Sequence, residues 1–240
     1  MGVDASGVRL RGVRSSVTKP TESLFERFHE SFLAGPERRL LRWMAARLPA
    51  FVMPDHLTAF GVFGALVVFI GYLAAFLSPN FLWLANFGLL IHWYGDSMDG
   101  TLARVRDIQR PKYGYFLDQN IDVIGNLLIA AGLGLSPYAR LDTALLALTG
   151  YHMCSIYVFV RNVVRREFHL AVMGFGPTEV RIGILVMNLT ILIAGAPTFT
   201  LFGQLFTWCD LVLLGTFVLL TVMFAISFAE EAKQLAREGE

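Results

Sequence analysis

The sequence predicts an all-α integral membrane protein with six transmembrane helices and an N-terminal amphipathic juxtamembrane helix. Hydrophobic residues make up 55% of its 240 residues and charged residues only 16%, whereas about a quarter of the residues of a soluble domain are charged. The apolar residues gather in six segments, each long enough to cross a bilayer as a helix. Nearly all Lys and Arg residues fall on one predicted side of the membrane.

The first fifty residues precede the apolar segments and divide into two parts. Residues 1–20 are basic, rich in Ser and Gly and aperiodic, so we expect a mobile N-terminus. Residues 21–50 place apolar side chains such as Phe25, Phe28 and Met44 at helical spacing, with arginines between them. This pattern predicts an amphipathic helix on the cytoplasmic membrane surface. A helix packed against neighbouring protein is the alternative.

The six predicted spans form one domain over residues 51–230, followed by a charged C-terminal tail over residues 231–240. Short turns that contain Pro separate several of them. We expect the spans at residues 57–77, 80–100, 116–136, 142–163, 180–197 and 206–229. The second and third spans differ from the others because each carries aspartates at one end.

The basic residues define the expected orientation of the chain. Nineteen of the twenty Lys and Arg residues lie on the side of the two termini, and only Arg140 lies on the other side. Since positive charge is retained in the cytoplasm, we expect both termini and the acidic ends of spans two and three to be cytoplasmic. The net charge of +1 gives no reason to expect a nucleic-acid partner.

Four aspartates, Asp96, Asp99, Asp118 and Asp122, stand out in this apolar chain because charge inside a bilayer is costly. The first two are three residues apart and the last two are four apart, so each pair shares one helix face. A hairpin of spans two and three would bring the pairs together. Oxygen ligands favour a hard ion such as Mg²⁺ or Mn²⁺. The spacing therefore predicts a site for one or two such ions.

Small and basic residues beside the aspartates favour a phosphate ligand. Gly100, Ala103 and Gly114 would let a nucleotide or phosphate approach the backbone closely. Arg104 offers a fork of donors that matches a phosphate group. Hard divalent ions commonly bind phosphate oxygens as well.

The whole constellation resembles the signature of the CDP-alcohol phosphotransferase family. That signature is D-x-x-D-G-x-x-A-R, a short spacer, and then G-x-x-x-D-x-x-x-D. Here it reads DSMDGTLAR from Asp96, nine residues, and GYFLDQNID from Gly114. The six-span layout is also similar to the family fold, so the resemblance covers about residues 50–230.

The resemblance implies that an alcohol attacks a CDP-linked donor and releases CMP. By position, it implies metal ligation by Asp96, Asp99 and Asp118, and a general base at Asp122 that also touches a metal. It implies two Mg²⁺ or Mn²⁺ ions and, at the level of the family, a homodimer. The implied nucleotide and phosphate cradle consists of Gly100, Ala103, Arg104 and Gly114.

Two shorter segments are similar to family members less closely. Pro54–Thr58 resembles a Pro-Asn-x-Leu-Thr segment near the cytidine, with Asp55 in place of Asn. Residues 174–181 lead into span five from the cytoplasmic side, and we expect Thr178 and Glu179 to line the site. An ordinary helix start is the alternative for both segments.

Basic residues on the cytoplasmic side are candidates for binding an anionic acceptor. The candidates are Arg110, Lys112, Arg161, Arg165 and Arg166, and of these we single out Lys112 and Arg161. The alternative is contact with the headgroups of membrane lipids.

Together these observations predict metal-dependent transfer of a phosphatidyl group from CDP-diacylglycerol to a small polar alcohol in phospholipid biosynthesis. The alternative within this chemistry transfers a phospho-aminoalcohol from a CDP-aminoalcohol to diacylglycerol. Gln119 follows Asp118 where several diacylglycerol-using relatives carry His, which favours the first arrangement. A divalent-cation transporter would also need buried acids, but not the Gly-Ala-Arg cradle beside them.

Overall fold

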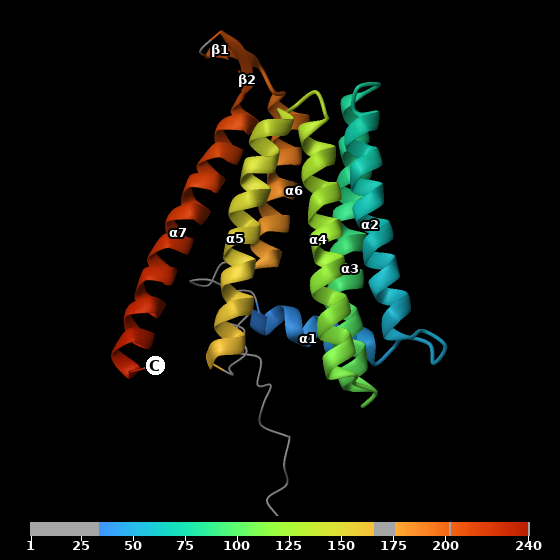
Figure 1. The fold of residues 1–240 in the computed structure, drawn as a ribbon. Coiled ribbons are helices and arrows are strands. Elements are labelled where there is room, and N and C mark those ends of the chain that lie inside the picture. The colour runs from blue at the N-terminus through green and yellow to red at the C-terminus, as the bar shows by residue number, and fades with distance from the viewer. Residues whose placement is uncertain (1–33, 166–175, 202, 240) are drawn as a thin grey trace, which may run out of the picture.

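The computed structural model of the chain describes residues 34–165, 176–201 and 203–239. Within these residues, six long helices lie side by side, α1 crosses one end of this bundle, and a β-hairpin lies at the opposite end (Figure 1). The helices are α1 (Ala34–Ala45), α2 (Pro54–Ala74), a 3-10 turn (Pro79–Phe81), α3 (Leu82–Val105), α4 (Pro111–Gly134), α5 (Leu141–Arg165), α6 (Pro177–Ala194) and α7 (Trp208–Glu238). The strands are β1 (Thr198–Leu201) and β2 (Gln204–Thr207). The predicted mobile segment over residues 1–20 lies outside the described residues, as does the first part of the predicted amphipathic helix, residues 21–33.

Each predicted span coincides with one of the long helices, α2 to α7. Four of them, α2, α5, α6 and α7, are long and apolar enough to cross a membrane. α3 and α4 are of similar length but carry the four aspartates, which lower their mean hydropathy. The mostly helical membrane architecture is thus confirmed, whereas the count of six crossings stays a prediction.

α3 and α4 extend further toward α1 than the predicted spans. α3 continues to Val105 and α4 begins at Pro111, whereas the spans were expected to end at residue 100 and to begin at residue 116. The aspartates therefore lie inside the helices and not at their ends. Hydropathy marks only the apolar part of a helix, and it cannot detect the polar turns that continue the helix beyond that part.

α2 and α3 pack with their backbones in contact because glycines occupy the shared surface. A Cβ atom at Gly88 would lie 2.7 Å from the backbone nitrogen of Val68, and a Cβ atom at Gly71 would lie 2.6 Å from that of Ala85. A larger residue at either position would force the two helices apart. α4 also packs against α2. The close pairing of α2 with α3 therefore helps to set where the aspartates of α3 stand relative to those of α4.

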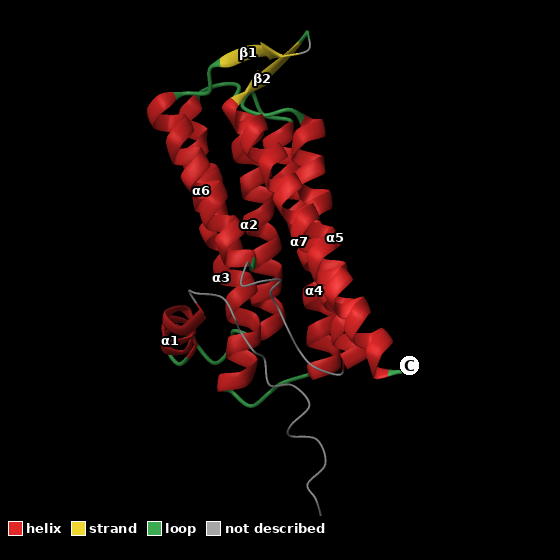
Figure 2. Ribbon diagram, turned by 90° about the vertical axis from the view of Figure 1, so that its left-hand side faces the viewer, coloured by secondary structure: helices red, strands yellow, loops and turns green. Residues whose placement is uncertain are grey.

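α1 packs against α3 at one end of the bundle (Figure 2). Leu41 and Ala45 are buried in this contact, whereas Trp43 is 56% exposed. Arg106, just after α3, donates a hydrogen bond of 2.8 Å to the carbonyl oxygen of Pro49 in the segment between α1 and α2. α1 is therefore a helix packed on neighbouring protein, and its contact with the membrane surface stays a prediction.

The all-α prediction misses the β-hairpin between α6 and α7. β1 and β2 pair antiparallel, with Thr198 opposite Thr207, and the rings of Phe199 and Phe206 stack with their centroids 6.3 Å apart. The guanidinium group of Arg140 lies 5.0 Å from the centre of the Phe206 ring. Threonine and aromatic residues favour strands. The stretch between the two predicted spans was nevertheless too short to reveal a strand period.

Candidate active site

α3 and α4 bring three of the four predicted aspartates together. One carboxylate oxygen from each of Asp96, Asp118 and Asp122 lies within 4.8 Å of the others, and all three side chains are partly buried. Asp118 and Asp122 are one helical turn apart on α4, so they present their carboxylates on one face toward α3. A cluster made only of oxygen donors suits a hard divalent cation. The residues present therefore fit the expected metal.

The fourth predicted aspartate, Asp99, contacts a side chain of α2. Its Oδ2 accepts a hydrogen bond of 2.6 Å from the hydroxyl of Thr58 on α2, and its Oδ1 accepts one of 2.5 Å from the backbone nitrogen of Gly100. Within the described part of the chain, the group with metal-ligand spacing does not include Asp99. Its role as a metal ligand stays a prediction, and the hydroxyl of Thr58 is one of the groups that hold its carboxylate.

Arg181 of α6 joins the acidic cluster. Its Nη2 donates a hydrogen bond of 2.5 Å to Oδ2 of Asp96, and the two side chains are only 11% and 19% exposed. The same Nη2 lies 3.4 Å from Nε2 of His92 on α3. His92 in turn places Nδ1 3.1 Å from the carbonyl oxygen of Gly61 on α2. Four helices therefore meet at this cluster: α3, α4 and α6 contribute charged side chains, and α2 contributes the carbonyl oxygen that contacts His92.

Neither Arg181 nor His92 is among the predicted site residues. Within residues 174–181, the predicted site residues are Thr178 and Glu179. One signal was available, because an ionisable residue inside an apolar span is a functional candidate by default. Arg181 and His92 both satisfy that condition, and their pairing became visible only once α3 and α6 were side by side.

Thr178 and Glu179 hold the start of α6. Glu179 accepts a hydrogen bond of 3.0 Å from the backbone nitrogen of Gly176, as in a capping box. Thr178 Oγ1 lies 3.4 Å from a carboxylate oxygen of Glu37 on α1, and Glu37 also accepts a bond of 2.7 Å from the indole of Trp93 on α3. These contacts support the helix-start alternative. A substrate contact for either residue stays a prediction.

The predicted phosphate cradle lies where the end of α3 approaches the start of α4. Arg104 is exposed and donates a hydrogen bond of 3.0 Å to Thr101 Oγ1. Gly114 is exposed on the first turns of α4, and a Cβ atom there would meet nothing within 4 Å. Gly100 and Ala103 are partly buried on α3. The geometry leaves room for a ligand at Gly114, and the binding roles stay predictions.

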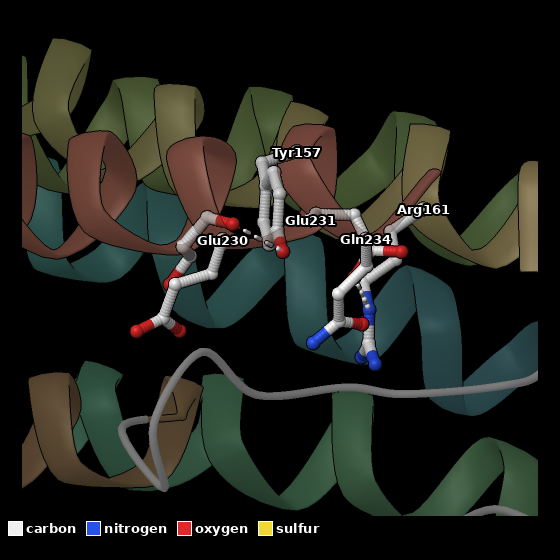
Figure 3. A pocket seen from close by; sticks show the side chains of 6 residues that line it. Tyr157, Arg161, Glu230, Glu231 and Gln234 are labelled. Atoms are coloured by element: carbon white, nitrogen blue, oxygen red, sulfur yellow. Dashed lines mark hydrogen bonds and ion pairs between the residues drawn. The ribbon is translucent and has the colours of Figure 1, made fainter. Parts of the chain in front are cut away.

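Three other predicted site residues occupy different surroundings. Asp55 forms an ion pair with Arg110, which links the start of α2 to the residue before α4. Lys112 is exposed in the first turn of α4. Arg161 donates from Nε to Glu231 of α7 over 2.9 Å, beside a small polar pocket (Figure 3). In this structure Arg161 therefore ties α5 to α7, and its contact with an acceptor stays a prediction.

An apolar cavity of about 200 Å³ adjoins the acidic cluster, between α4, α5, α6 and α7. It exists because α6 packs mainly against α3, while α7 packs against α5. Most of its lining is aliphatic, for example Leu133 and Met187. The polar side chains in its wall are those of Arg181, Asn126, Tyr151, Thr216 and Glu179, the last of which was predicted to line the site. Arg181 therefore touches the acids on one side and the apolar cavity on the other. Such a junction suits a molecule with an anionic group and a hydrocarbon chain.

A family model described as CDP-alcohol phosphatidyltransferase matches residues 51–229 of the chain. No curated protein matches the chain. The matched residues contain α2 to α6, most of α7, the acidic cluster and Arg181.

Proposed function

The chain belongs to the CDP-alcohol phosphatidyltransferase family, and on this premise we propose that it transfers the phosphatidyl group of CDP-diacylglycerol to a small polar alcohol and releases CMP. Enzymes of this family transfer substituted phosphate groups from a CDP-alcohol and depend on divalent metal. The chain is accordingly an integral membrane transferase. The choice of CDP-diacylglycerol, of the acceptor and of the direction is our proposal.

The observation that carries the proposal is the position of Arg181 between the acidic cluster and the apolar cavity. A diphosphate placed at the cluster would have its lipid chains beside the aliphatic wall between α4 and α7. Gln119 donates a hydrogen bond of 3.1 Å to Asp118. Several relatives that use diacylglycerol as the acceptor carry His at this position, and a glutamine amide cannot exchange a proton as an imidazole does. Gln119 therefore supports the arrangement in which the lipid belongs to the donor, CDP-diacylglycerol.

In the proposed reaction, the acceptor hydroxyl oxygen forms a bond to the phosphorus that carries diacylglycerol. The bond from that phosphorus to the oxygen shared with CMP breaks, and CMP leaves with the electron pair. Asp122 takes the hydroxyl proton, and Arg181 donates hydrogen bonds to the phosphate oxygens. Two Mg²⁺ or Mn²⁺ ions held by Asp96, Asp118 and Asp122, with Asp99 as a further ligand, would offset the charge of the diphosphate.

We place the active site on the cytoplasmic side, with both termini and α1. This orientation rests on the distribution of Lys and Arg, since Arg140 alone, among the Lys and Arg residues that the structure describes, lies at the end of the bundle where the hairpin is found. It requires α2 to α7 to make six crossings. A homodimer is proposed on the family resemblance alone.

The test is CMP release by the purified full-length chain in lipid vesicles. CDP-diacylglycerol is offered with inositol phosphate, glycerol phosphate, serine, choline or inositol, with Mg²⁺, Mn²⁺ or EDTA. A parallel arm offers CDP-choline or CDP-ethanolamine with diacylglycerol. We expect release in the first arm only, with one acceptor preferred and none with EDTA. Release only in the second arm reverses donor and acceptor, and metal uptake without CMP release supports the transporter.

The role of Asp122 is tested in the same assay by Asp122→Asn. A general base contributes about 10²- to 10⁴-fold to rate, so we expect a loss of that size in CMP release. Binding of CMP in the presence of Mn²⁺, measured by calorimetry, should change much less. An equal loss of binding and turnover would mean that Asp122 serves mainly as a metal ligand.

A further inference from the structure

A continuous line of polar contacts runs from the backbone of α2 to the acidic cluster. It begins at the carbonyl oxygen of Gly61, passes through both ring nitrogens of His92 and the Nη2 of Arg181, and ends at Asp96. The imidazole is almost entirely buried, with 2% of His92 exposed. The proposed chemistry assigns no role to this imidazole.

The neighbours of His92 determine which ring nitrogen carries the proton. A carbonyl oxygen can only accept a hydrogen bond, and a guanidinium group can only donate one. Nδ1 must therefore be protonated to bind Gly61, and Nε2 must present its lone pair to Arg181. His92 is thus a neutral imidazole with a defined tautomer, and it supplies an acceptor that faces the arginine.

Packing also restricts the ring. A Cβ atom at Gly125 of α4 would lie 2.9 Å from Cε1 of His92, so the backbone of α4 passes directly over the imidazole. The ring is therefore enclosed by α2, α3 and α4, and it cannot turn away from Arg181 without disturbing one of these helices. A rigid acceptor is the type of group that can hold a long flexible side chain in one position.

Arg181 needs such support. Its side chain reaches the cluster from α6 and also borders the apolar cavity. The two hydrogen-bond contacts described for the guanidinium group both use Nη2, with Asp96 at 2.5 Å and His92 at 3.4 Å, and the group is also attracted electrostatically to Asp122. A guanidinium group has five N–H donors in one plane. Holding Nη2 between two acceptors fixes that plane, so that further donors can be directed at a phosphate.

We propose that His92 is a positioning residue that acts through Arg181, holding its guanidinium group in the plane that binds the substrate diphosphate. The proposal rests on the proposed function, because it takes the substrate to be a CDP-linked diphosphate. It adds the requirement that the effect of His92 on substrate disappears when Arg181 is removed.

Two substitutions separate the two hydrogen bonds of His92. His92→Asn keeps a donor near the position of Nδ1 for Gly61 but loses the acceptor that faces Arg181. His92→Gln keeps an acceptor near the position of Nε2. Loss of a hydrogen bond to a charged group corresponds to about 10- to 100-fold. We expect a loss of this size in kcat/KM for His92→Asn, mostly in kcat, with partial rescue in His92→Gln.

The decisive measurement is a double-mutant cycle with Arg181→Gln, read both as CMP release and as CMP binding by calorimetry. If His92 acts through Arg181, His92→Asn should change either quantity by less than about two-fold in the Arg181→Gln background. Tyr72→Phe is the matched control. It removes a buried bond of 2.8 Å between Tyr72 and Asn188, which also joins α6 to the helices beside it, farther from the cluster. It should lower the melting temperature and leave CMP binding unchanged.

Three outcomes overturn the inference. Equal effects of His92→Asn in both backgrounds would mean that the imidazole acts independently of Arg181. A loss of CMP binding in Tyr72→Phe as large as that in His92→Asn would mean that any loosening of α6 has this effect. Wild-type activity in His92→Asn would remove the role altogether. A wild-type chain that neither binds nor releases CMP would instead overturn the proposed function.

Discussion

At the scale of single residues, the ion pair of Arg181 with Asp96 is the most demanding feature of the chain. Both groups are largely removed from water, at 11% and 19% exposure of their side chains. Removing one partner of such a pair leaves a buried charge without compensation, which typically costs about 3–5 kcal/mol. An exposed pair contributes about 0–1 kcal/mol. Arg110 and Asp55 form such an exposed pair, because their side chains are 49% and 45% exposed.

We therefore predict that Arg181→Leu lowers the free energy of unfolding by about 3–5 kcal/mol, whereas Arg110→Leu lowers it by less than about 1 kcal/mol. Adding Asp96→Asn to Arg181→Leu should recover part of the loss, since it removes the charge left behind. Unfolding in mixed micelles followed by circular dichroism measures all four proteins. Equal destabilisation by the two arginine substitutions would show that Arg181 is well solvated.

The residues that the sequence could predict are those whose partners are near in the chain. Asp118 and Asp122 share a helix face by spacing alone, and Asp96 joins them through one hairpin. Arg181 meets Asp96 across 85 positions of sequence, and His92 meets Gly61 across 31. Thr58 and Asp99 are likewise 41 positions apart. The periodicity of the sequence cannot predict these three contacts, since they depend on which helices become neighbours.

At the scale of helices, the close pairing of α2 with α3 depends on glycines at the positions where the two backbones touch. Gly88→Ala would place a methyl group 2.7 Å from the Val68 backbone nitrogen. Neither backbone can yield locally, so we predict a destabilisation of about 1–3 kcal/mol, typical of an overpacked core. Gly215→Ala on α7 is the control, because a Cβ atom there meets nothing within 4 Å. It should be neutral or slightly stabilising. Melting temperatures of the two variants test this, and equal values would contradict it.

The existence of the helices followed from apolar length, but their ends did not. α7 continues to Glu238, past the expected span, because Glu231 and Glu238 pair with Arg165 of α5. α6 stops at Ala194, where Gly195 takes a positive φ of 73°. The ion pairs depend on which helices become neighbours, and the end of α6 depends on the backbone conformation of a glycine. A hydropathy profile contains neither kind of information.

At the scale of the whole molecule, the two ends of the bundle differ in kind. The end with α1 carries the acidic cluster, the start of α4 and the ion pairs of α5 with α7. The other end is closed by the hairpin and by Asp210, which accepts hydrogen bonds of 2.8 Å from Arg140 and 2.7 Å from Thr207 through their backbone nitrogens. The apolar cavity lies beside the acidic cluster, between α4, α5, α6 and α7, where the proposed function places the lipid chains.

The proposed orientation predicts which loops face the cytoplasm, and this can be measured without any substrate. Single cysteines at Ser78, Gln109 and Pro137 probe the loops α2–α3, α3–α4 and α4–α5, in a background where the buried Cys154 and Cys209 are replaced by Ala. A membrane-impermeant maleimide should label Gln109→Cys only in inside-out vesicles. It should label Ser78→Cys and Pro137→Cys only in right-side-out vesicles. Labelling of all three from one side would mean that α3 and α4, the two helices that carry the aspartates, do not cross the membrane.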